Sequence, residues 1–184
     1  TPIKSSAASD VYKRQDYAFY GCENLERISL PSTLQSIGKD AFNGCKKLKE
    51  VIMPNAVTEI GENSFRNCSS LERVVFSNGL SSIPGYAFAG CDSLTEIDLP
   101  VKITSIYKGC FEVYGLQKAT IHCSRMYSSG KCFGNEPEVY AYKGAMESVY
   151  GITKRSIHTL RLIDIPSETL VKVTVTDVLS LIHI

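Results

Sequence analysis

Seven cysteines and three histidines are the side chains of this chain best suited to chemistry, and four of the cysteines are evenly spaced. Cys22, Cys45, Cys68 and Cys91 follow one another at intervals of 23 residues. Residues that recur on neighbouring strands of a stacked repeat lie about 4.8 Å apart. That spacing suits a disulfide, but side chains in one column point the same way, which is poor disulfide geometry. We therefore predict a column of buried, reduced thiols that pack as small apolar groups.

The other candidates for chemistry are scattered. Cys110, Cys123 and Cys132 fall outside the column, and a Cys123–Cys132 disulfide is an alternative for a secreted protein. The histidines, His122, His158 and His183, are far apart, and no paired Cys-x-x-Cys motif is present. Gly-x-Ser-x-Gly, His-Glu-x-x-His and glycine-rich phosphate loops are also missing from the sequence. We therefore expect no catalytic residues, no metal and no cofactor.

The spacing of the cysteines belongs to a longer repeat. The phenylalanines recur every 23 residues, at Phe19, Phe42, Phe65, Phe88 and Phe111. Apolar residues keep the same interval at Leu25, Leu48, Leu71 and Leu94, and at Ile37, Ile60, Ile83 and Ile106. A unit of this length cannot bury its own apolar side chains, so it must stack on its neighbours. The period predicts a solenoid whose function lies on its surface.

Each unit contains a strand and a turn. Residues 25–30 alternate so that Ile28 and Leu30 point inward, and Pro31 ends the strand because proline donates no backbone hydrogen bond. Parallel strands are expected near residues 26–30, 49–53, 72–76 and 95–99. Phe42 is expected in a short helical turn on another side. A left-handed residue is predicted to end each such turn, at Gly21, Gly44, Asn67 and Gly90.

Two copies of the unit, LERISLPSTLQSIGKDAFNGCKK and LTEIDLPVKITSIYKGCF, carry a family likeness. The unit resembles the BspA-type leucine-rich repeat, and the likeness covers about residues 16–123. It implies a β-rich solenoid of 23-residue units with stacked parallel strands, short helical turns on another side and a small α+β C-terminal cap. It also implies a cell-surface or secreted protein that works by adhesion and protein binding, with glycan as an alternative ligand.

We expect five segments. Residues 1–15 are expected to be a non-native or disordered lead, because extending the period backwards would place Ser5 and Arg14 on buried positions. The repeats occupy 16–123 and a cap 124–160, followed by a linker or truncated next domain at 161–178 and an artefact at 179–184. Within the last three, we expect strands at Glu138–Tyr142 and Leu170–Thr176, a helix at Gly144–Tyr150 and an extended segment at Ile152–Leu160.

The outward-facing strand positions are the candidate binding surface. One column alternates in charge, and in the next column Ile52 and Val75 are adjacent, exposed aliphatic residues. The candidate site on this expected concave face comprises Arg27, Ser29, Glu50, Ile52, Arg73, Val75, Glu96 and Asp98. A bland interpretation is that opposite charges on neighbouring strands merely stabilise the sheet.

The composition sets the remaining expectations. A formal net charge of +1 does not favour nucleic acid, and no apolar run is long enough to span a membrane. The sequence thus predicts a non-catalytic binding module with a protein ligand, and glycan as an alternative. Two other hypotheses remain open: a structural spacer or stalk with no ligand of its own, and an enzyme whose catalytic domain lies outside this sequence.

Overall fold

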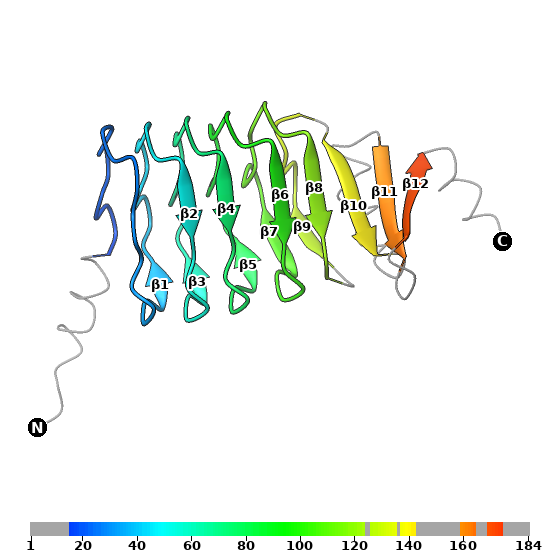
Figure 1. The fold of residues 1–184 in the computed structure, drawn as a ribbon, viewed down its shortest axis with the longest axis horizontal. Helices are drawn as coiled ribbons and strands as arrows, with labels where there is room; N and C mark the ends of the chain where they lie inside the picture. The colour runs from blue at the N-terminus through cyan, green and yellow to red at the C-terminus, as the bar shows by residue number, and fades with distance from the viewer. Residues whose placement is uncertain (1–14, 124–125, 136, 143–158, 165–168, 175–184) are drawn as a thin grey trace, which may run out of the picture.

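The computed structural model describes residues 15–123, 126–135, 137–142, 159–164 and 169–174. Successive repeats stack in a row with parallel strands, which confirms the predicted solenoid (Figure 1). In this described part of the chain, no helix is long and apolar enough to cross a membrane.

One side of the solenoid, here called the long-strand face, carries one strand from each repeat after the first and continues into β10. These strands are β2 (Glu50–Ile52), β4 (Arg73–Val75), β6 (Glu96–Leu99), β8 (Lys118–Ile121) and β10 (Glu138–Tyr142). The stretches predicted at 49–53, 72–76 and 95–99 contain β2, β4 and β6, so these predictions are confirmed. β2 pairs with β4, and β6 pairs with β8, in parallel and in register by repeat position.

A second side, the short-strand face, is built from the segments after each proline or turn. Its strands are β1 (Ser36–Ile37), β3 (Glu59–Ile60), β5 (Ser82–Ile83), β7 (Ser105–Tyr107) and β9 (Tyr127–Ser129). Parallel pairing joins β1 to β3, and β5 to β7 and β9. The isoleucines of the first four strands, Ile37, Ile60, Ile83 and Ile106, point into the core.

The strand predicted near residues 26–30 is not formed. Lys49 N–H donates to Glu26 O at 3.3 Å, but beyond this bond the segment leaves the ladder. Ile28 and Leu30 are consequently only half-buried, although the alternation predicted that both would be in the core. A strand needs a ladder partner for its backbone groups, and β2 pairs only with β4.

The third side contains the phenylalanine column. The rings of Phe42 and Phe65 stack with centroids 5.1 Å apart, and those of Phe65 and Phe88 with centroids 5.2 Å apart. All three are buried, as predicted. The column continues through Phe111 to Phe133, whose centroids are 5.9 Å apart. Phe133 was not foreseen, because it follows Phe111 by 22 residues and breaks the period.

Consecutive turns, and not the expected helical turn, surround each phenylalanine. The predicted left-handed residues are confirmed, with positive φ at Gly21, Gly44, Asn67 and Gly90. A second left-handed column, which the sequence did not reveal, lies four residues earlier at Tyr17, Asp40, Asn63, Tyr86 and Gly109. A left-handed residue on each side of the phenylalanine prevents a continuous helix.

The sheet of the long-strand face continues beyond the repeats. The predicted strand at Glu138–Tyr142 is confirmed as β10, which pairs in parallel with β8. β11 (Thr159–Asp164) pairs with β10 in parallel. β12 (Thr169–Thr174), which overlaps the stretch predicted at Leu170–Thr176, pairs antiparallel with β11. The expected helix at Gly144–Tyr150 and most of the extended segment at Ile152–Leu160 lie outside the described residues.

Candidate functional site

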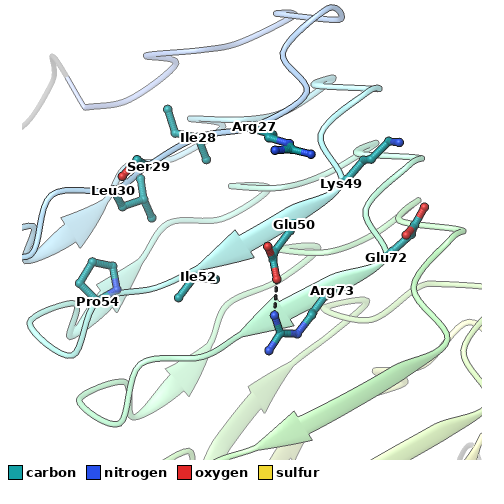
Figure 2. Close-up of a pocket in the computed structure, with 10 residues that line it drawn as sticks. All are labelled: Arg27, Ile28, Ser29, Leu30, Lys49, Glu50, Ile52, Pro54, Glu72 and Arg73. Atoms are coloured by element: carbon teal, nitrogen blue, oxygen red, sulfur yellow. Dashed lines mark hydrogen bonds and ion pairs between the residues drawn. The ribbon is translucent and has the colours of Figure 1, made fainter.

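A depression of about 850 Å³ lies on the long-strand face, between segment 27–30 and β2 (Figure 2). We call it the β2 cleft. It is lined by Arg27, Ile28, Ser29, Leu30, Lys49, Glu50, Ile52, Pro54, Glu72 and Arg73.

The cleft exists because backbone hydrogen bonding between the first two repeats stops at Lys49 and resumes only at Thr58. Beyond the bond from Lys49 to Glu26, the next backbone bond runs from Thr58 N–H to Gln35 O at 2.9 Å. Within the described residues, no backbone hydrogen bond joins 27–34 to 50–57. The two segments therefore separate between these points and leave apolar side chains accessible from the surface.

The centre of the cleft is apolar. Ile52 is 53% exposed, and its Cα partner in the ladder is Val75 on β4. The structure thus brings Ile52 and Val75 together as predicted, although Val75 is half-buried and less accessible than expected. The exposed Ile52 and the half-buried Ile28 and Leu30 together give the cleft its apolar lining.

Charged side chains surround this centre and pair across repeats. Glu50 and Arg73 form an ion pair on adjacent strands (Figure 2). Lys118 and Glu96 approach to 4.0 Å two repeats further on. The charged side chains of the alternating column therefore form two ion pairs, Glu50–Arg73 and Glu96–Lys118, and Arg27 lies at the end of the column. Exposed ion pairs of this kind contribute about 0–1 kcal/mol each, so they orient the rim more than they stabilise the fold.

The predicted site residues divide between two neighbouring clefts. Five of them, Arg27, Ser29, Glu50, Ile52 and Arg73, line the β2 cleft. Arg73 also lines a second depression of about 680 Å³, together with Val75 and Asp98, which we call the β4–β6 cleft. Glu96 lines neither cleft. The sequence reasoning missed Ile28, Leu30 and Pro54 as surface residues, because their repeat positions are those of the core and of the strand end.

His122 is a further residue that the pattern did not reveal. Its Nε2 lies 2.7 Å from Asp98 Oδ1, at the rim of the β4–β6 cleft. The signal was faint, because His122 comes after a repeat that is one residue shorter than the others. Together with Arg73, this pair gives the second cleft a mixed-charge rim.

Three of the four evenly spaced cysteines form the predicted buried column. Cys45, Cys68 and Cys91 are fully buried free thiols. Burial raises the pKa of the Cys45 thiol to about 12, and it also raises the pKa of Cys91. Buried thiols with raised pKa values are inert, since the thiolate is the reactive form. Cys22 is exposed, which corrects the prediction, because no earlier described repeat covers it.

The remaining cysteines are buried too. The alternative Cys123–Cys132 disulfide is not formed, because Cys132 is a free thiol, and both residues are buried. A hydrogen bond from the Cys110 thiol lowers the pKa of Cys132, whereas burial raises the pKa of Cys110. Across the described ranges, no three histidine, cysteine or acidic side chains are placed so that they could hold a metal ion.

Comparisons with known proteins agree with this geometry. The family model described as the BspA type leucine rich repeat region matches residues 13–139 in six copies. A leucine-rich cell surface protein from Faecalibacterium prausnitzii is similar in structure, with a TM-score of 0.52 and 28% identity. That match covers 78% of this chain and 34% of the other, so the chain spans about a third of that protein's length.

A second solved structure is also similar. The leucine-rich repeat protein of T. pallidum matches with a TM-score of 0.54 and 25% identity, over 74% of each chain. A search of curated proteins gives no match.

Proposed function

The chain belongs to the BspA-type leucine-rich repeat family, and on that premise we propose that it is a non-catalytic, protein-binding module of a cell-surface or secreted protein. The observation that carries the proposal is the β2 cleft, where the exposed Ile52 lies inside a charged rim. An apolar centre with polar surroundings is the usual anatomy of a protein interface. The name of the F. prausnitzii structure, a cell surface protein, supports the location.

The ligand contacts are assigned by position. Ile52 and Val75 are the central apolar contacts, and Arg27, Glu50 and Arg73 form the rim, with Ser29 beside them. Glu96 and Asp98, which are on β6, extend the surface beyond β4. Since charges of both signs are interleaved, long-range attraction is weak, and association is expected to depend little on salt. Glycan remains an alternative ligand for the same surface.

The test is a double substitution, Ile52→Ser with Val75→Ser, assayed on arrays of purified cell-surface and secreted proteins and of glycans. Binding to a protein ligand should fall at least tenfold, about 1.4 kcal/mol. Tyr114→Ser is the control, because Tyr114 is also exposed but lines a different depression, with Tyr86 and Glu112, away from the cleft. Unchanged binding by the double variant would move the site elsewhere.

A spacer is the second candidate function, and one observation favours it. The charged side chains of the column form ion pairs between repeats, Glu50 with Arg73 and Glu96 with Lys118. Such pairing is expected of a surface that only stabilises its own stack of repeats. If the unmodified chain binds nothing on either array, the spacer function is favoured over ligand binding.

A further inference from the structure

One column of charges departs from the pattern of the other columns. Where charged side chains of neighbouring repeats form ion pairs, their signs are opposite, as in Lys46 and Glu23, which lie 2.8 Å apart. Residues 16, 39, 62, 85, 108 and 131 form a column at intervals of 23 residues, and they read Asp, Lys, Glu, Gly, Lys and Lys. Among the described repeats, Lys108 and Lys131 are the only neighbours in a column that carry the same charge.

Backbone hydrogen bonds confirm that the two lysines are direct neighbours. Tyr86 N–H donates to Lys108 O at 3.2 Å, and Gly109 N–H donates to Lys131 O at 2.8 Å, so Lys131 holds the same position one repeat later. Like charges opposite each other on neighbouring strands are destabilising, and the same repulsion acts between neighbouring turns. Both side chains are exposed, and neither forms an ion pair within the described ranges. The stack therefore gains no stability from this pair.

The two lysines line one depression of about 130 Å³, among the turns around the phenylalanine column. We call it the lysine depression. Its other lining residues are Tyr86, Gly109, Glu112, Tyr114, Phe133 and Gly134.

Two glycines make room for the lysine depression. Gly109 has a φ of +66°, and a Cβ there would lie 2.4 Å from Cε1 of Tyr86, so the tyrosine side chain lies directly against the glycine. Arg66 of the preceding repeat contacts the same ring, with its Cζ 5.5 Å from the ring centroid. A Cβ on Gly134 would lie 2.8 Å from the backbone nitrogen of Val113. Bare backbone therefore forms part of the lining, and Tyr86 is held in place beside it.

The charges of the depression favour a ligand with one negative group. Lys108 and Lys131 share the lining with Glu112, so two positive charges and one negative charge leave a net charge of +1. Lys131 Nζ donates to Gly134 O at 3.3 Å, which keeps this ammonium group at the depression. An ammonium group binds an oxyanion as a point charge and has three protons to donate. A ligand with a single carboxylate would balance the charge of the site.

The remaining lining favours a sugar ring as the body of that ligand. Tyr114 is 70% exposed, and a tyrosine offers an apolar face and a polar tip, which match the C–H groups and hydroxyls of a sugar. The volume of about 130 Å³ is below the roughly 300–1,000 Å³ of pockets for drug-sized ligands, so the depression suits a single sugar unit.

We propose that the lysine depression binds the carboxylate-bearing unit of an acidic saccharide, such as a glucuronic acid residue. The carboxylate lies between the ammonium groups of Lys108 and Lys131, and the sugar ring packs against Tyr114. The lysine depression and the β2 cleft have no lining residue in common, so this is a second binding function beyond the protein binding proposed above.

The first experiment measures the role of charge by calorimetric titration of the full chain. Methyl β-glucuronoside should bind at least about tenfold more tightly than uncharged methyl β-glucoside, as two exposed ion pairs together allow. Lys108→Gln with Lys131→Gln should remove this difference. Lys39→Gln with Lys47→Gln is the matched control and should preserve it, because it removes the same charge and Lys39 holds the same repeat position as Lys108. Equal binding of the two sugars, or an equal loss in the control, would overturn the proposal.

The second experiment separates a sugar from other carboxylates. Acetate and N-acetylglutamate amide carry one carboxylate without a sugar ring, and should bind at least about threefold more weakly than the glucuronoside. Tyr114→Ser should lower the affinity for the glucuronoside to that for acetate. If acetate binds as tightly as the glucuronoside, the site takes an adventitious ion only, and the proposal fails. If N-acetylglutamate amide does so, the site takes an acidic side chain of a protein, and the saccharide is rejected.

The two binding sites are tested separately. Ile52→Ser with Val75→Ser changes the β2 cleft and should leave glucuronoside binding unchanged. If this double variant loses its protein ligand but the unmodified chain never distinguishes the two sugars, the protein-binding function stands and the saccharide site is rejected. If the sugars are distinguished but no protein ligand is found, the saccharide site stands alone.

Discussion

The thiol of Cys68 donates a hydrogen bond to the backbone oxygen of Phe42, 3.1 Å away in the preceding repeat. Cys45 makes the same bond to Phe19 at 3.2 Å, and Cys91 to Phe65 at 3.1 Å. The cysteine column thus satisfies the carbonyl oxygens of the phenylalanine column. This accounts for a thiol at a position where packing alone would accept alanine.

Thiol labelling should separate the cysteines by burial. Cys22 is exposed and should react first with iodoacetamide in the native protein, whereas Cys45, Cys68 and Cys91 should react only in denaturant. Mass spectrometry of labelled peptides gives the order directly. Rapid native labelling of Cys68, at a rate close to that of Cys22, would contradict a buried column.

Stability should fall at high pH because of Cys45. Its pKa is raised from 9.0 to about 12 in the folded chain, so the neutral thiol is favoured by folding. The resulting stability is complete below pH 9 and is lost as the pH rises towards 12, with a slope of up to about 1.4 kcal/mol per pH unit. Urea unfolding at pH 8, 10 and 11 measures it, with Cys45→Ala as the control for other titrating groups. An equal loss of stability in the unmodified protein and in the Cys45→Ala variant would show that Cys45 is not the cause.

The phenylalanine column should be energetically uneven. Phe65→Ala should lower the free energy of unfolding by about 3–5 kcal/mol, because the ring is fully buried between two others. Phe19→Ala is the matched control and should cost much less, because Phe19 is 37% exposed and stacks on one ring only among the described residues. Similar costs at both positions, measured by urea unfolding, would show that burial does not set the contribution.

The apolar surface of the first described repeat should promote association. Among the described residues, Phe19, Leu30 and Leu34 line a depression of about 240 Å³ there, and exposed apolar patches of this kind favour contacts between chains. Sedimentation at increasing concentration should show oligomers, and Phe19→Lys should reduce them. A monomer at every concentration would count against this prediction.

The parts of the fold that could be predicted are those on which every repeat agrees. Phe42, Phe65 and Phe88 share one spacing and one environment, so their column follows from the period alone. The left-handed column through Asp40 and Asn63 was hidden, because tyrosine occupies the same position at Tyr17 and Tyr86.

The candidate site was harder to predict, because it depends on a segment that does not pair with its neighbouring strand. Ile28 has the residue type of a core position, and only the loss of its ladder partner brings it to the surface. Phe76 likewise fits an apolar column of Leu, Met and Phe, so its edge-to-face packing with Phe88 and Phe111 appears only once the rings are placed. A change in the volume of a single side chain leaves no periodic pattern in the sequence.

The junction between β4 and β6, at which neither strand ladder continues, also has a mechanical consequence. Stacked repeats that share ladders on three sides resist bending in every direction. Between β4 and β6 the backbone is joined on the phenylalanine side alone among the described residues. Bending stress on the rod should therefore concentrate at this one joint. The stiff segments on either side would swing about the Phe65–Phe88 stack, so the angle between them is the coordinate along which the rod deforms first.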